Sequence, residues 1–263
     1  MDLRRVIDLL VAHLENEPSV EGAFLAGSLV NENRDEYSDV DLGVASADSQ
    51  AAFEAAYALR GRLLAAVGEP VHAIERGWGH CQMVAALYGK SAFPPVGLEV
   101  DVVFSQLQHV GEQMPYAPYE VVFDRAGRLK PALDGLPRQP PSAEVKPELE
   151  AHMRGFPFAV HDALKAHGRG DSFCLQAVLE GMRQAIFHAA AARDGVPVYG
   201  AKRAYRHLSA FERRVIEDSY RDNTERSVQQ LTRLYTNCLS EIQSDYQIEA
   251  AVEHLQNALL EIL

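Results

Sequence analysis

A proline-rich segment between Lys130 and Pro147 most constrains how this chain folds, because it separates two kinds of hydrophobic pattern. It reads KPALDGLPRQPPSAEVKP and holds five prolines in eighteen residues. Proline lacks a backbone N–H group and breaks both helices and sheet ladders. Before this segment, strand-like apolar runs alternate with helical patterns, and after it the apolar residues recur at helical spacing. We therefore expect two domains, over residues 1–135 and 145–263.

The two patterns predict an α+β fold, in which a mixed sheet with flanking helices is followed by an all-α helical bundle. The first domain should hold an amphipathic helix from Leu3 to about Glu15 and a helix capped by Asp48 that runs to about Val67. Strands are expected at 20–28, 38–46, 70–76, 81–89, 97–105 and 119–124. Helical segments of the second domain are expected at 148–167, 171–195, 202–222, 225–245 and 247–263.

Two of the expected strands carry pairs of carboxylates at alternate positions. Asp39 and Asp41 stand at the start of one strand, and Glu99 and Asp101 lie in another. Residues two apart on a strand point the same way, so each pair occupies one face of its strand. If the strands are neighbours, the carboxylates converge, and such a cluster is stable only with bound cations such as Mg²⁺ or Mn²⁺. A pair of such ions is one way in which proteins move a phosphoryl or nucleotidyl group.

A Gly-Ser pair ends the strand that precedes the Asp-x-Asp pair. Glycine lets the backbone approach a ligand closely, and successive N–H groups with a hydroxyl can hold phosphate oxygens. Gly-Ser, a spacer, Asp-x-Asp and a later aspartate together resemble the nucleotidyltransferase superfamily that includes DNA polymerase β and kanamycin nucleotidyltransferase. The matching residues, within a resemblance that spans roughly residues 20 to 130, are Gly27, Ser28, Asp39, Asp41 and Asp101.

This resemblance implies metal-dependent transfer of a nucleotidyl group, expected to be adenylyl from ATP, to a hydroxyl of a small molecule such as an aminoglycoside-like antibiotic. Asp39 and Asp41 would hold two Mg²⁺ ions (Mn²⁺ also fits), and Asp101 would complete the site beside the attacking hydroxyl. Ser38, the first residue of SDVD, would join the Gly-Ser pair on the nucleotide side. The expected partners are a nucleoside triphosphate and a hydroxylated acceptor.

The second half resembles the helical domain of the streptomycin- and spectinomycin-type adenylyltransferases. In that group an arginine on one helix, a lysine after the next loop and a tyrosine one helix later reach the nucleotide. The matching positions here are Arg183, Lys202 and Tyr220. Asp124, at the end of VVFD, matches an acid on the nucleotide side. A lysine just before a helix can neutralise triphosphate charge as a point cation.

The attacking hydroxyl needs a carboxylate to accept its proton, and three glutamates are candidates. Glu99 shares a strand face with Asp101, Glu75 lies in HAIERG, and Glu180 lies on the same expected helix as Arg183. Periodicity places only Glu99, which is therefore the candidate catalytic base.

The composition limits which binding partners and which cellular compartment are expected. The net charge of −12 disfavours binding to long nucleic acid, which needs a basic footprint. No apolar run approaches the roughly 18 residues of a membrane span, so no membrane partner is expected. Three widely spaced cysteines form no disulfide framework, which favours the cytoplasm. A homodimer is compatible with the resemblance.

Two other functions compete for the same motifs. A non-catalytic, regulatory protein of this fold, antitoxin- or sensor-like, remains open, although such a protein should lose its metal carboxylates first. A nucleotide-sugar glycosyltransferase also uses Asp-x-Asp to bind metal, but that function leaves Gly27-Ser28 and Asp101 unexplained. A metal-dependent nucleotide-transfer assay separates the three.

Overall fold

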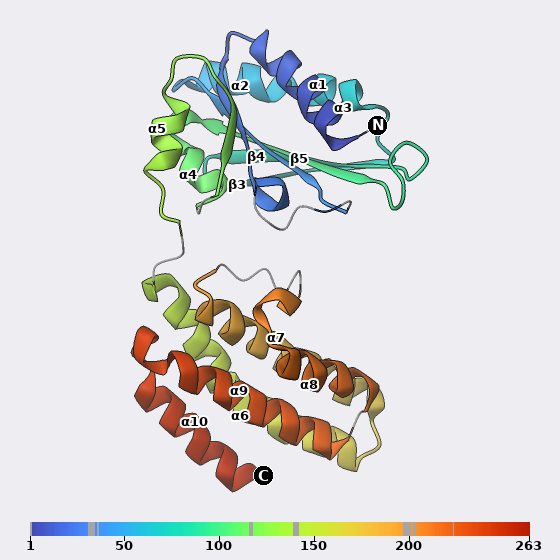
Figure 1. The fold of residues 1–263 in the computed structure, drawn as a ribbon, viewed down its shortest axis with the longest axis vertical. Coiled ribbons are helices and arrows are strands. Elements are labelled where there is room, and N and C mark those ends of the chain that lie inside the picture. Colours follow the sequence, from blue (N-terminus) through green and yellow to red (C-terminus); the bar gives the residue numbers. More distant parts are fainter. Residues whose placement is uncertain are drawn as a thin grey trace. The chain divides into compact units, whose positions relative to one another are not determined.

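The computed structural model describes residues 2–30, 35, 37–115, 118–138, 142–196, 201, 204–222 and 224–263. The chain divides into two compact units, Met1–Arg138 and Gln139–Leu263, each with its own hydrophobic core (Figure 1). The first unit is a mixed sheet with flanking helices and the second is helical, which confirms the predicted α+β fold class.

A six-stranded sheet in the order β3-β4-β5-β2-β1-β6 forms the centre of the first unit. Only β2 and β5 are parallel, and every other neighbouring pair is antiparallel. The strands are β1 (Val20–Leu25), β2 (Val40–Ser46), β3 (His72–Trp78), β4 (Cys81–Tyr88), β5 (Leu98–Gln106) and β6 (Glu120–Asp124).

Helices cover the two faces of this sheet unequally (Figure 1). Three helices, α1 (Leu3–Glu15), α2 (Gln50–Ala58) and α3 (Arg60–Val67), pack on one face, where they bury the apolar side of β2 and β5. On the other face, α4 (Val110–Gln113) and α5 (Leu129–Asp134) pack against Phe24 and Ala45. Short 3-10 helices, η1 (Gly27–Val30) and η2 (Leu107–His109), follow β1 and β5.

The helix expected from Asp48 to Val67 is in fact two helices, so that prediction is wrong in its cap and its length. Ser49 caps α2 by accepting a hydrogen bond from Ala52 N, whereas Asp48 accepts one from Gln108 N at 2.9 Å. Leu59 lies between the helices, and its N–H bonds to Ala56 O three residues back. This tighter turn ends one helix and begins the next.

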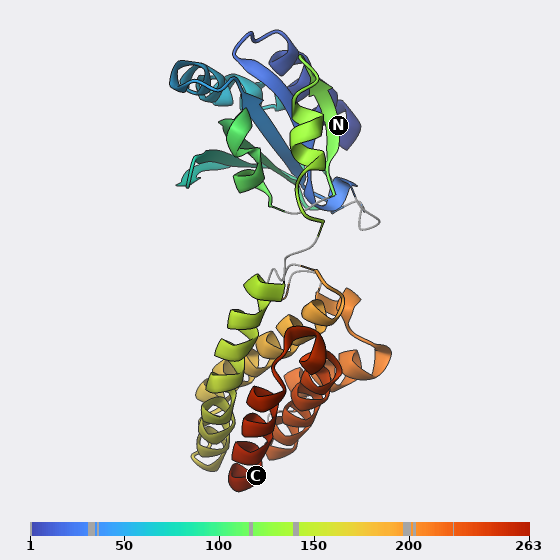
Figure 2. The same ribbon diagram turned by 90° about the vertical axis from the view of Figure 1, so that its left-hand side faces the viewer.

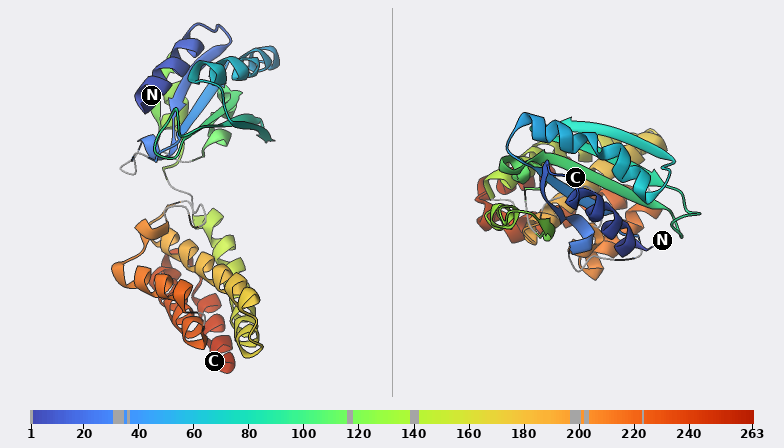
Figure 3. Two further views of the ribbon diagram at one scale, coloured as in Figure 1. Left: turned by 90° about the vertical axis from the view of Figure 1, so that its right-hand side faces the viewer. Right: turned by 90° about the horizontal axis from the view of Figure 1, so that it is seen from above.

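The second unit is built from five helices and a short 3-10 helix among its described residues (Figure 2, Figure 3). Its longest helices, α6, α7 and α9, pack side by side around a core that includes Phe156, Met182 and Tyr235. The elements are α6 (Ser142–Gly168), α7 (Ser172–Arg193), η3 (Ala204–His207), α8 (Ala210–Arg221), α9 (Glu225–Tyr246) and α10 (Glu249–Ile262).

Two details differ from the sequence patterns. The segment expected to be one helix over 202–222 begins its α-helix at Ala210, because Ser209 and Glu212 form a reciprocal capping box. The proline-rich segment is also partly helical, since α5 contains Pro131 and α6 contains Pro147. Pro131 lies in the first turn of α5, where a backbone N–H has no intrahelical partner to lose.

Within the described part of the chain, no helix is both long and apolar enough to cross a membrane.

A buried ion pair gives the helical unit a predictable pH dependence. Arg193 Nη1 lies 2.9 Å from Glu212 Oε1, and the Glu212 side chain is only 8% exposed. Burial alone would raise the pKa of Glu212, but hydrogen bonds from Arg193 and Ser209 outweigh it and lower the pKa to about 2. A lowered folded-state pKa stabilises the fold above the unfolded pKa of about 4.3, and this stability is lost as the pH falls toward 2.

We expect Glu212→Gln to reduce the free energy of unfolding of the helical unit by about 3 kcal/mol at pH 7, the value of the pKa shift. The difference from wild type should shrink steadily as the pH falls from 4.5 to 2, since wild type loses the same interaction on protonation. Denaturant unfolding across this pH range measures it. Glu217→Gln, at an exposed position of α8, is the control and should match wild type at every pH.

Candidate active site

The carboxylates of β2 and β5 come together because these strands are parallel neighbours. Asp41 and Asp101 are direct partners in the ladder. Side chains at paired positions of adjacent strands share a face, so both carboxylates lie on the side opposite the buried Leu42 and Val100. The condition on which the sequence analysis made this convergence depend, that the two strands are neighbours, is met. Glu99 lies two residues before Asp101 on the same face of β5, and Asp39 directly precedes β2. Together with Asp41 and Asp101, these residues are called the carboxylate group.

Gly27 shapes the space around Asp41. The chain leaves β1 with Ala26 N donating to Asp41 O at 3.0 Å, and Gly27 then takes a positive φ of 64°. A Cβ atom at Gly27 would lie 2.0 Å from Asp41 Oδ2. The carboxylate thus occupies the space that any other residue would fill with a side chain. Gly27 is required here both for its backbone conformation and for its close approach to Asp41.

Ser38 anchors the chain immediately before the Asp-x-Asp pair. It is 2% exposed, its Oγ accepts from Asp35 N at 2.9 Å, and the same hydroxyl donates to Asp35 Oδ1 at 3.1 Å. Ser38 N also donates to Asp35 O. The sequence analysis missed Asp35, although an aspartate three residues before a serine is a recognisable turn signal. This turn fixes where Asp39 enters the sheet.

Of the three candidate bases, only Glu99 lies with the aspartates. It occupies the same face of β5 as Asp101, opposite Leu87 of β4. Glu75 lies on β3 and bonds to Tyr57 of α2 and Arg60 of α3, on the opposite face of the sheet. The hydrogen bonds from Tyr57 and then from Arg60 lower the pKa of Glu75. Glu75 is therefore held in a surface ion pair and is not part of the carboxylate group.

The third candidate, Glu180, belongs to a network with Arg183 and Tyr220 in the helical unit. Arg183 is 1% exposed, and it donates to Ser219 Oγ at 2.9 Å, Ser219 O at 2.6 Å and Glu180 Oε2 at 3.2 Å. Its guanidinium carbon lies 3.6 Å from the centre of the Tyr220 ring, whose hydroxyl also bonds to Glu180. Arg183 therefore joins α7 to α8 and does not present its guanidinium to solvent. The half-exposed Tyr220 ring is the accessible part of this network.

The remaining nucleotide-side residues are Asp124 and Lys202. Both Asp124 oxygens accept backbone N–H bonds, from Arg128 and Lys130, at the start of α5. The described contacts thus give Asp124 a role in ending β6 and beginning α5. Lys202 lies outside the described residues. Nucleotide contacts by Arg183, Lys202, Tyr220 and Asp124 stay predictions.

The donor set of the carboxylate group fits a hard divalent cation. Asp39, Asp41 and Asp101 offer only oxygen ligands, and Mg²⁺ and Mn²⁺ prefer oxygen. Asp41 and Asp101 offer them from paired positions on one face of the sheet. A transition metal that prefers nitrogen or sulfur would find neither ligand type among these residues. Asp41 and Asp101 alternate along their strands with the fully buried Val40 and Val100, so the backbone beneath them is closely packed, and Asp39 directly precedes β2.

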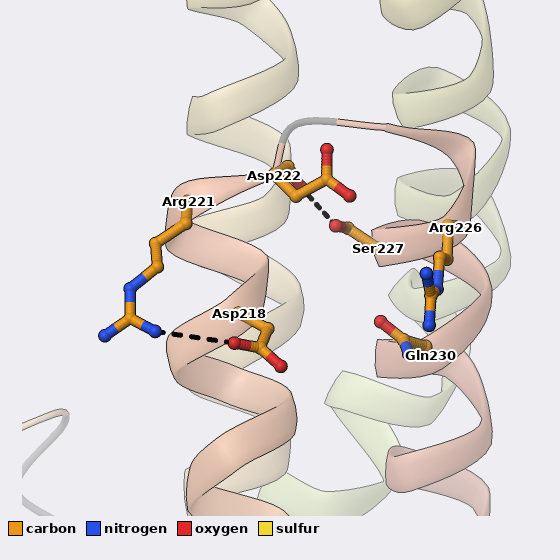
Figure 4. Close-up of a pocket in the computed structure, with 6 residues that line it drawn as sticks. All are labelled: Asp218, Arg221, Asp222, Arg226, Ser227 and Gln230. Carbon is orange, nitrogen blue, oxygen red and sulfur yellow. Dashed lines mark hydrogen bonds and ion pairs between the residues drawn. The ribbon is translucent and has the colours of Figure 1, made fainter.

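A separate hollow of about 210 Å³ lies in the helical unit, at the turn between α8 and α9 (Figure 4). It is lined by Asp218, Arg221, Asp222, Arg226, Ser227 and Gln230. Arg221 pairs with Asp218 at 3.5 Å, and the Ser227 hydroxyl donates to Asp222 O. The Ser227–Asp222 contact closes the turn between the helices, the Arg221–Asp218 pair lies within α8, and none of the predicted site residues lines the hollow.

No protein-family model and no curated protein sequence matches the chain. Several solved structures are similar to it, among them the following two. An aminoglycoside 6-adenyltransferase from Bacillus subtilis is 11% identical with a TM-score of 0.36, covering 98% of this chain and 99% of that one. A nucleotidyltransferase-like protein from Exiguobacterium sibiricum is 12% identical with a TM-score of 0.39, covering 95% of this chain and 79% of that one. Such low TM-scores assign no residue roles, so a function for this chain has to follow from its own residues.

Proposed function

We propose that this chain transfers a nucleotidyl group from a nucleoside triphosphate, ATP in the first instance, to a hydroxyl of a small molecule, in a reaction that depends on Mg²⁺ or Mn²⁺. The observation that carries the proposal is the pairing of Asp41 with Asp101 across β2 and β5, with the backbone of Gly27 against the Asp41 carboxylate. Gly27 and Asp41 belong to the Gly-Ser and Asp-x-Asp motifs, and a structural role alone does not require two carboxylates to lie side by side.

Each residue has a defined part in this proposal. Asp39, Asp41 and Asp101 would hold the divalent cations, which when bound would neutralise the triphosphate and lower the pKa of the acceptor hydroxyl. Gly27 and Ser28 would present backbone N–H groups and a hydroxyl to phosphate oxygens. The acceptor oxygen attacks the α-phosphorus, the bond from that phosphorus to the bridging oxygen breaks, and pyrophosphate leaves.

Glu99 would accept the proton of the attacking hydroxyl. Its position on the Asp101 face of β5 supports this role, whereas Glu75 faces the helices and Glu180 is bonded to Gln184, Arg183 and Tyr220. A carboxylate can serve as a base when it lies within hydrogen-bonding reach of the reacting hydroxyl.

The acceptor that we favour is a positively charged, polyhydroxylated small molecule of the aminoglycoside class, which would make the chain an antibiotic-modifying enzyme of the cytoplasm. The excess of acidic side chains over the whole chain and the extra carboxylate of Glu99 support a cationic acceptor. A free hydroxyl is required for the transfer itself.

The test is transfer of labelled nucleotide from ATP to a panel of hydroxylated antibiotics, with Mg²⁺ and with chelator. We expect transfer to at least one cationic member with Mg²⁺, and none with chelator. Neutral hydroxylated antibiotics are the control for the charge of the acceptor. Transfer to these alone would contradict the proposal that the acceptor is cationic. No transfer to any acceptor, by protein that binds nucleotide, would favour the regulatory alternative.

A further inference from the structure

Three metal-ligating side chains meet where α6 packs on α7 in the helical unit. Glu148 and His152 are four residues apart on α6 and therefore share one face of that helix. His188 lies on α7, the helix that packs beside it. Their ligand atoms all lie within 4.8 Å of one another. The carboxylates proposed for nucleotidyl transfer belong to the other unit, so this cluster is a separate feature.

The spacing of these atoms suits a tetrahedral metal centre. Zn²⁺ binds imidazole nitrogen and carboxylate oxygen at about 2.0–2.2 Å, which sets tetrahedral ligand atoms about 3.3 Å apart. His188 Nδ1 and Glu148 Oε1 are already 3.2 Å apart. The two imidazole rings have centroids 4.4 Å apart and are inclined by 55°. Because imidazole lone pairs lie in the ring plane, inclined rings can direct them toward one point.

The surroundings keep both histidines ready for a metal. Burial lowers the pKa of His188, and burial together with the nearby His188 lowers the pKa of His152. Both rings are therefore neutral at pH 7, the form that binds metals. His188 Nδ1 is buried without a hydrogen bond, since Glu148 approaches it at ion-pair distance but in an unsuitable direction. A buried polar nitrogen without a partner costs stability that a metal bond would recover.

We propose that Glu148, His152 and His188 bind a divalent transition metal of the zinc type, which links α6 to α7. Two imidazoles and one carboxylate favour Zn²⁺ or Co²⁺ over Mg²⁺, the reverse of the oxygen-only set on β2 and β5. Three protein ligands leave a fourth position for water.

A second cluster of the same composition provides the internal comparison. His80, His109 and Glu112 also gather, in the first unit, but both imidazole Nδ1 atoms lie 2.8–2.9 Å from the same Glu112 oxygen. Their rings stack 3.7 Å apart, inclined by only 12°. The lone pairs of parallel rings run side by side, and hydrogen bonds to Glu112 already satisfy both nitrogens. This cluster needs no metal, and its variants serve as controls.

The experiment titrates Zn²⁺ into the chelator-treated full chain against a chromophoric zinc indicator, with millimolar Mg²⁺ present to occupy the aspartate site. We expect one zinc equivalent that Mg²⁺ does not displace. His152→Gln and His188→Gln should each lower the zinc affinity by at least about 10- to 100-fold. Loss of a residue that only hydrogen-bonds to a metal ligand already has an effect of that size. His80→Gln should leave it unchanged.

Glu148→Gln is a variant that should fold normally, since its side chain is 55% exposed and its replacement disturbs no buried packing. Without zinc its melting midpoint should equal that of wild type, and with zinc it should lose most of the rise in midpoint that wild type shows. The proposal is overturned if the three variants bind zinc as tightly as wild type, if His80→Gln alone removes the zinc equivalent, or if zinc leaves the wild-type midpoint unchanged.

Discussion

Asp41→Asn is expected to lower the rate of nucleotidyl transfer by about 10³-fold or more while the first unit stays folded. Asp41 is paired with Asp101 across the parallel strands and would be one of the residues that hold the cations. An amide removes the negative charge that holds them, and a loss of about 4 kcal/mol of transition-state stabilisation corresponds to three orders of magnitude. Asp39→Asn should behave in the same way.

Stability and metal binding separate this effect from misfolding. Asparagine has the size of aspartate and removes one of several mutually repelling charges, so the melting midpoint without metal should be unchanged or slightly higher. Mn²⁺ affinity, measured by calorimetry, should fall together with turnover. Asp8→Asn removes the same charge from an exposed position of α1, where it breaks only a surface ion pair with Arg4, and it should leave turnover and Mn²⁺ affinity unchanged. Near-normal turnover by Asp41→Asn, or a midpoint several degrees lower without metal, would contradict the assignment of Asp41 as a metal ligand.

Local patterns predict the carboxylate pairs because alternation along a strand fixes which residues share a face. The buried Val40 and Val100 and the half-buried Asp41 and Asp101 follow this alternation. Register is a different matter, because β2 and β5 are separated by two helices and two strands. No local feature aligns Asp41 with Asp101 rather than with a neighbouring residue, so the direct pairing emerges only from the packed sheet.

In the helical unit, the sequence predicts the helices but not the contacts between them. Periodicity predicts α7, and the resemblance to the adenylyltransferases presents its Arg183 as a cation available to a nucleotide. Its burial depends on Ser219, which is 36 residues away and reaches it only through the packing of α8. The pairing of His152 with His188 depends in the same way on how α6 meets α7. Contacts between helices are decided by packing over the whole unit, which a pattern within one helix does not contain.

Gly27→Ala is expected to lower turnover by about 100-fold or more at a modest cost in stability. A Cβ atom at residue 27 would stand 2.0 Å from Asp41 Oδ2, and the cheapest relief is rotation of the Asp41 side chain away from it. That rotation moves a carboxylate proposed to bind the cations, and a displacement of about 1 Å in a catalytic group can cost 10²-fold in rate. The positive φ of 64° adds about 1–2 kcal/mol of backbone strain for alanine.

Gly127→Ala separates the effect of the close contact with Asp41 from the effect of backbone strain. Gly127 has nearly the same backbone conformation, with φ of 68°, but a Cβ there would meet nothing within 4 Å. Both variants should therefore lose a similar free energy of unfolding, while only Gly27→Ala loses turnover and Mn²⁺ affinity. Denaturant unfolding and transfer assays on the matched pair measure the two effects. Equal activity in the two variants would mean that the close approach of Gly27 to Asp41 has no part in catalysis. A much larger loss of stability at Gly27 would mean that Asp41 is held by the fold and cannot rotate away.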